Sequence, residues 1–196
     1  MACPEPDLAE IHEAITELLR DEQIATLATV DASGWPSAST MHIAGDGLSV
    51  YIHTFSYNRK YAEMLADPRV SYAVSYLPPG GFEDRFALRS LQVKGRASLL
   101  TTAEEIQRAV AVSREQFPWL AQTAMYDNVK LPDQGQQVFF RIDPVSGVWA
   151  DHRVRLLWRV FLDFDASGTS ITGKSPYDAV VGRRNWPGSG HTQAVP

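Results

Sequence analysis

The chain has 196 residues, 44% of them hydrophobic and 21% charged, which excludes disorder throughout and indicates one ordinary globular domain. A formal net charge of −5 argues against nonspecific binding of nucleic acid, which needs an excess of lysine and arginine on one face. Cys3 is the only cysteine, so an intrachain disulfide is excluded and a reducing compartment is favoured. Neither a signal peptide nor a segment apolar enough to span a bilayer is evident, and we expect a cytoplasmic protein.

The N-terminal third predicts a helix followed by three strands. Asp7 and Glu10 form a capping-box pattern ahead of a helix whose apolar residues recur on one face. Strands are then predicted over 24–30, 37–43 and 48–54, because these segments are rich in β-branched and apolar residues and are separated by glycine-containing turns.

A short helix follows the third of these strands and carries two cations in its first turn. Ser56 is the predicted N-cap, and Pro68 prevents the helix from running further. Arg59 and Lys60 lie at the positive end of the helix dipole, which is unfavourable unless an anion lies in front of the helix. Free backbone N–H groups at that end favour a phosphate, although two solvated surface cations are the simpler interpretation.

The remaining pattern alternates strands with one more helix. Strands are predicted over 70–76 and 89–99, and Thr102 with Glu105 opens a helix that ends near Pro118. Residues 119–134 are expected to be a loop that contains a helical turn. Two short strands are predicted over 137–142 and 148–150, around a turn at 143–147.

The C-terminal part divides into an alternating strand and a tail. Residues 154–164 alternate between apolar and charged side chains, as in an edge strand or a dimer contact. From Asp165 onward the chain is glycine-rich, so we expect one domain over 1–164 and a loop-like tail over 165–196. Arg183, Arg184 and Trp186 could close over a cofactor, although a surface tail is the alternative.

The order of these segments carries a resemblance to a known family. The resemblance lies in an ordered series of segments: IATLATVDASGWPSASTMHI, GLSVYIHT, NRK and a helix that ends in DPRV. Over about residues 8–150, the chain resembles the pyridoxamine 5′-phosphate oxidase-like superfamily. The resemblance implies a mainly β protein: an antiparallel, Greek-key-type split barrel of six or seven strands with about three helices. Members of this superfamily bind FMN and are usually homodimers, and both properties are expectations here.

The resemblance also implies positions for the flavin. The Arg-Lys pair that opens the helix after Asn58 would hold the FMN phosphate, and the two residues that end the preceding strand would line the flavin. The second strand of the hairpin would run beside the isoalloxazine ring and the ribityl chain. A glutamine that often contacts the flavin matches Ser90 by position, whereas the available Gln92 lies two residues further on. The implied cofactor residues are Ser39, Thr40, Met41, His53, Thr54, Asn58, Arg59, Lys60, Ser90 and Gln92.

The function implied is an FMN-dependent oxidoreductase acting on an unidentified small molecule. The chain departs from the true oxidases in its substrate region, where residues 151–155 have the ingredients of an Arg-x-His motif in the wrong order. No catalytic residue can be named. A reductase that uses the deazaflavin F-420, and a non-catalytic flavin- or haem-binding protein, remain as alternatives.

Other chemistries have little support in the sequence. It holds no Walker motif, no G-x-G-x-x-G, no H-E-x-x-H and no C-x-x-C. His42 and His53 could approach one another on neighbouring strands, but ordinary barrel positions are a better interpretation than a metal pair. We therefore expect a small-molecule substrate and a homodimer, with no metal, nucleic acid or membrane as partner.

Overall fold

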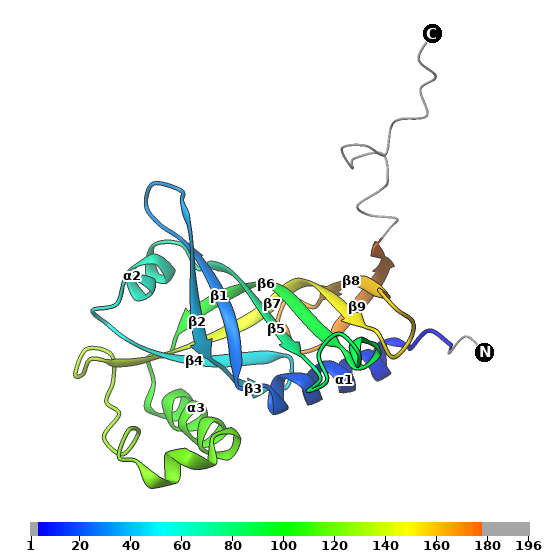
Figure 1. Ribbon diagram of the computed structural model, residues 1–196. Helices are drawn as coiled ribbons and strands as arrows, with labels where there is room; N and C mark the ends of the chain where they lie inside the picture. Colours follow the sequence, from blue (N-terminus) through cyan, green and yellow to red (C-terminus); the bar gives the residue numbers. More distant parts are fainter. Residues whose placement is uncertain (1–3, 178–196) are drawn as a thin grey trace.

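The computed structural model describes residues 4–177 of the chain (Figure 1). In this part of the chain there are three α-helices, two 3-10 helices and nine strands. The helices are α1 (Leu8–Asp21), α2 (Arg59–Ala66) and α3 (Ala103–Gln116), with η1 (Arg85–Ala87) and η2 (Pro118–Gln122). The strands are β1 (Ile24–Val30), β2 (Pro36–His42), β3 (Ala44–Asp46), β4 (Ser49–Phe55), β5 (Arg69–Tyr76), β6 (Arg89–Leu99), β7 (Gln137–Asp151), β8 (Arg159–Phe164) and β9 (Ile171–Pro176).

Six of the described strands form the antiparallel barrel that the sequence predicts. Their order is β2-β1-β5-β6-β7-β4, and β4 returns beside β2, where the barrel closes. β3 extends the sheet beyond β4, while β8 and β9 add to the outside of β7. Alternate residues face inward along each strand, and on β6 these are Leu91, Val93, Gly95 and Ala97. The expectation of a mainly β split barrel is confirmed.

Two capping boxes define the longer helices, as the sequence predicts. The backbone N–H of Glu10 donates to Asp7 Oδ1 and that of Asp7 to Glu10 Oε2; Thr102 and Glu105 make the same pair of bonds. α1 buries one apolar face against the barrel through Ile11, Ile15, Leu18 and Leu19. α3 belongs to a second core cluster, which joins it to β4 and β7 through Tyr51, Leu100, Ile106, Ala109, Phe117, Leu120 and Phe139.

The predicted turn at residues 143–147 does not exist. β7 runs without interruption from Gln137 to Asp151 and pairs with β6 from Phe140 to Asp151. The register shifts at Lys94/Gly95, where Pro144 lies opposite Gly95. A β-bulge tolerates a proline, which cannot donate to the ladder. Gly95 is needed there because a Cβ would lie 2.7 Å from the carbonyl oxygen of Asp143.

Two further predictions about local structure are wrong. Asn58, not Ser56, is the N-cap of α2, because the chain turns through residues 56–58 before the helix begins. The tail after Asp165 is not wholly loop-like, because β9 pairs with β8 and Lys174 Nζ donates to the carbonyl of Pro6. Arg183, Arg184 and Trp186 lie outside the described residues. No helix within residues 4–177 is long and apolar enough to cross a membrane.

Candidate functional site

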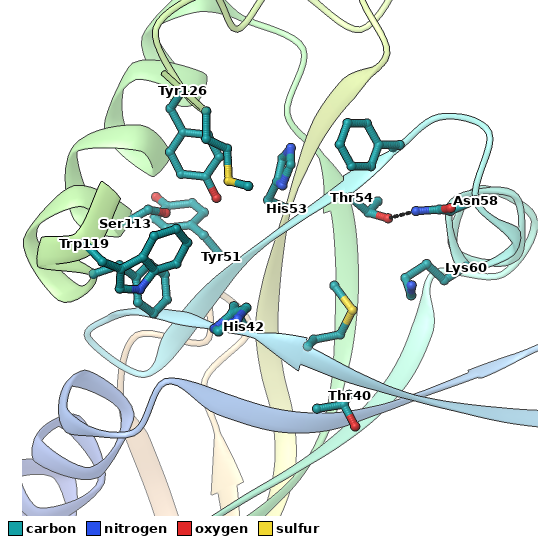
Figure 2. A pocket seen from close by; sticks show the side chains of 14 residues that line it. Thr40, His42, Tyr51, His53, Thr54, Asn58, Lys60, Ser113, Trp119 and Tyr126 are labelled. Carbon is teal, nitrogen blue, oxygen red and sulfur yellow. Dashed lines mark hydrogen bonds between the residues drawn. The ribbon is translucent and has the colours of Figure 1, made fainter. Parts of the chain in front are cut away.

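A pocket of about 300 Å³ lies between the barrel and the helical segment that follows β6 (Figure 2). We call its two walls the barrel side and the helical side. The barrel side comes from β2, β4 and the start of α2: Thr40, Met41, His42, Tyr51, His53, Thr54, Phe55, Asn58 and Lys60. The helical side comes from α3, η2 and the turn after η2: Ser113, Phe117, Trp119, Met125 and Tyr126.

The end of the barrel side at α2 is polar and electropositive. Asn58 Nδ2 donates a 3.1 Å hydrogen bond to the buried Thr54 Oγ1 (Figure 2). As the side chain of Asn58 is turned toward Thr54, no side-chain hydrogen bond caps the described α2 helix. The half-buried Lys60 lines this end, which adjoins the N-terminus of α2, an arrangement that suits an anion.

Arg59 lies apart from the pocket, although it is the neighbour of Lys60. Its Nε is 3.1 Å from Glu63 Oε1, and its side chain is 65% exposed while that of Glu63 is 5% exposed. Glu63 Oε2 also accepts a 2.6 Å hydrogen bond from Thr29 Oγ1 on β1. The ion pair therefore directs the Arg59 guanidinium along α2 to Glu63, the residue that contacts Thr29 on β1.

The other end of the pocket is aromatic. The ring of His53 packs against Phe55, Tyr126 and Phe139, with centroid distances of 5.2, 5.1 and 5.1 Å. His42 lies edge-on to Phe117 at 5.6 Å and against Trp119 at 6.0 Å. His42 on β2 and His53 on β4 therefore pack against aromatic rings of the helical side.

Burial keeps two side chains of this aromatic end, His53 and Tyr126, uncharged at pH 7. It lowers the pKa of His53 to about 4, so the imidazole is uncharged at pH 7. It raises the pKa of Tyr126 to about 12, so that phenol keeps its proton. His53 Nε2 is buried and has no hydrogen-bond partner among the described residues. Such an atom costs free energy in the ligand-free protein and is a common feature of binding sites.

Six of the ten residues implied by the resemblance line this pocket: Thr40, Met41, His53, Thr54, Asn58 and Lys60. Ser39 is half-buried on β2, and Arg59 pairs with Glu63. Ser90 and Gln92 are on β6, where Gln92 borders a separate hollow of about 130 Å³ with Lys94 and Phe161.

The sequence interpretation missed the whole helical side. Trp119 and Tyr126 belong to a segment without periodicity, so no sequence pattern places them near β4. His42 and His53 both line the pocket, yet no group of three or more potential metal ligands occurs within residues 4–177.

The fold is that of a split-barrel protein, with a pocket between the barrel and its helical segment. The family model described as pyridoxamine 5′-phosphate oxidase matches residues 11–147, and the chain belongs to that family. Among curated proteins, none matches the chain.

Solved structures agree on the fold. A protein of Listeria innocua, provisionally described as a pyridoxamine 5′-phosphate oxidase, has a TM-score of 0.53 and 22% identity over 69% of this chain and 94% of its own. A conserved hypothetical protein of Mycobacterium tuberculosis has a TM-score of 0.59 and 21% identity, covering 76% and 90%. A heme-binding protein of Mycobacterium smegmatis has a TM-score of 0.56 and 19% identity, covering 74% and 55%. At these identities the likeness shows the fold alone.

Proposed function

We propose that the protein is an FMN-dependent oxidoreductase that acts on a small molecule, with the flavin held on the barrel side of the pocket. The observation that carries this proposal is the convergence of six implied flavin residues, from β2, β4 and α2, on one pocket. Thr40 and Met41 come from β2 and the other four residues from β4 and the start of α2, so the fold, and not adjacency in the chain, joins these two groups.

The polar end fits a phosphate. Lys60 would supply a point charge, and the N–H groups of the first turn of α2 would donate to phosphate oxygens. Thr54 and Asn58 would add neutral hydrogen-bonding groups next to that charge. Arg59, held by Glu63, would raise the local positive potential without lining the pocket.

The middle of the barrel side fits a planar ring with polar edges. Thr40 and Met41 line the pocket from β2, and the neutral His53 lines it from β4. A bound flavin supplies the electron transfer, while the protein binds it, orients it and excludes water. A deazaflavin would use the same surfaces, so it remains the alternative cofactor.

Haem binding is the second candidate. It is supported by the two histidines of the pocket and by the likeness to the heme-binding protein of Mycobacterium smegmatis. The rings of Phe55, Tyr126 and Phe139 pack around His53, whose Nε2 is buried. Ligation of an iron by this atom would require these rings to move, which favours the flavin.

The visible absorption spectrum of the purified full-length protein tests the proposal. Flavin bands, as purified or after incubation with FMN and gel filtration, are the expected result. A Soret band after addition of hemin, without uptake of FMN, would replace the flavin by haem. Uptake of the deazaflavin alone would replace FMN by the alternative cofactor.

A further inference from the structure

The helical side leaves large apolar side chains open to the pocket. Trp119 is 39% exposed and Met125 41% exposed, although both line the cavity. Trp119 contacts His42 and Phe117 on part of its ring, and its remaining surface, with that of Met125, is apolar surface left uncovered in the pocket. The barrel side, in contrast, offers the buried Thr54 and the positive end of α2.

Charge is confined to one end of the pocket. Among the described residues that line it, Lys60 is the only lysine, arginine, aspartate or glutamate, and it belongs to α2 on the barrel side. Ser113 and Tyr126 contribute hydroxyl groups on the helical side, which can donate or accept hydrogen bonds without a charge. Tyr126 stays protonated because burial raises its pKa to about 12.

We propose, building on the flavin site proposed above, that the helical side is the substrate subsite and that it selects an uncharged molecule with a planar aromatic ring. The ring stacks on Trp119, with Met125 as a polarizable neighbour, and the hydroxyl groups bind a carbonyl or hydroxyl substituent. The flavin occupies the barrel side, so substrate and cofactor meet in the middle of the pocket.

The charges of the described residues distinguish this subsite from one that binds a phosphorylated amine such as pyridoxamine 5′-phosphate. A charged substrate that leaves water needs an ion pair or several charge-assisted hydrogen bonds in compensation. The described residues of the helical side supply neither, and Lys60 is taken by the cofactor phosphate. An uncharged aromatic ring loses little on leaving water and gains contact with Trp119 and Met125.

A matched pair of probes tests the inference: 2-naphthamide, which is uncharged, and 2-naphthoate, which has the same ring system and a negative charge. Both are titrated by calorimetry into the FMN-loaded protein and into the FMN-free protein. We expect 2-naphthamide to bind the loaded protein at least about tenfold more tightly than 2-naphthoate. Equal or tighter binding of 2-naphthoate to the FMN-loaded protein, or no binding of 2-naphthamide to either form, would overturn the inference.

Substitutions of Trp119 test where 2-naphthamide binds. Trp119→Ala should weaken 2-naphthamide about tenfold, as expected for the loss of a stacked ring, whereas Trp119→Phe should largely restore it. Trp35→Ala is the matched control, because Trp35 is 72% exposed on the β1–β2 turn and does not line the pocket. If Trp119→Ala weakens FMN as much as it weakens 2-naphthamide, the helical side holds the flavin ring and the inference is wrong.

The two proposals fail separately. A protein that takes up no FMN contradicts the proposed function, yet the FMN-free protein still reports whether Trp119 binds the uncharged ring. A protein that binds FMN but ignores 2-naphthamide contradicts only the substrate subsite.

Discussion

The Nε of Arg59 lies 3.1 Å from Oε1 of Glu63, one turn further along α2, where the carboxylate is almost fully buried. Thr29 Oγ1 on β1 binds the other oxygen of the same carboxylate at 2.6 Å. The first two cations of α2 are therefore unequal: Arg59 is directed toward β1, while Lys60 lines the pocket. The sequence alone treats them as an equivalent pair.

This inequality predicts different effects on FMN binding. Lys60→Ala should weaken FMN by about 1.5–3 kcal/mol, because a charged hydrogen-bonding partner of the phosphate is lost. Arg59→Ala should cost only about 0–1 kcal/mol, as expected for an exposed charge outside the pocket. Quenching of flavin fluorescence measures both, with Arg20→Ala as the control for loss of one exposed charge on α1. Equal losses at Arg59 and Lys60 would show that Arg59 leaves Glu63 and reaches the phosphate.

The hydrogen bond between Thr29 and Glu63 should contribute to stability. Thr29→Val keeps the shape of the side chain but removes a donor from a buried carboxylate, which should lower the free energy of unfolding by about 1–3 kcal/mol. Urea unfolding measures this change. Thr26→Val is the matched control, because Thr26 is exposed on the same strand and should lose nothing. An equal effect at both positions would mean that the Glu63 bond contributes no stability.

Features set by neighbouring residues could be predicted from the sequence. The capping box of Asp7 and Glu10 lies within one helical turn, so the sequence determines the start of α1. Thr54, Asn58 and Lys60 are also close in the chain, at the end of a strand and the start of the next helix. Their place at one end of a pocket follows from that local geometry.

Features set by distant partners could not be predicted. Pro144 is typical of a turn, yet β7 continues through it because β6 pairs with β7 on both sides of the bulge. Trp119 reaches the pocket because the preceding helix α3 is fixed at its end: Gln116 Nε2 donates to the carbonyls of Leu19 and Glu22, and Gln116 Oε1 accepts from the N–H of Gly45. No periodicity in the sequence reports such bonds.

The buried imidazole predicts a pH dependence of stability. The pKa of His53 falls from 6.5 to about 4 on folding. Between these values the unfolded chain binds a proton at His53 and the folded protein does not, so the free energy of unfolding decreases as the pH is lowered through this window. The decrease approaches about 3 kcal/mol at the lower limit.

A variant without a titrating ring isolates this effect. In urea unfolding of the FMN-free protein from pH 7 to pH 4, His53→Gln should lose less stability than the wild type. Carboxylates that titrate in the same range are common to both proteins and cancel in the comparison. Parallel curves for the two proteins would mean that folding does not lower the pKa of His53.

Assembly is a further prediction. The β5–β6 loop and residues 152–157 are joined by a 2.9 Å contact between His152 Nδ1 and the carbonyl oxygen of Arg85. They expose large apolar side chains together: Leu77 (69%), Phe82 (80%), Phe86 (53%), Leu156 (44%) and Leu157 (61%). We propose that a second copy of the chain covers this surface in a homodimer that buries about 2,000 Å² or more.

Sedimentation velocity at micromolar concentration tests the homodimer. The wild type should sediment as a dimer, and replacement of both Phe82 and Phe86 by Ser should shift it toward monomer. Val145→Ser, at a single exposed apolar residue on β7, serves as the control. A wild type that sediments as a monomer at this concentration would contradict the homodimer.

We propose that the N-terminal end of α2 binds the phosphate of a flavin, and a comparison of FMN with riboflavin tests this directly. The two ligands share the ring and the ribityl chain and differ only in the phosphate. Titration of the FMN-free protein, followed by flavin fluorescence, should give a dissociation constant for FMN at least about tenfold below that for riboflavin. The difference should shrink in Lys60→Ala. Equal affinities for FMN and riboflavin, or binding of neither, would contradict the account.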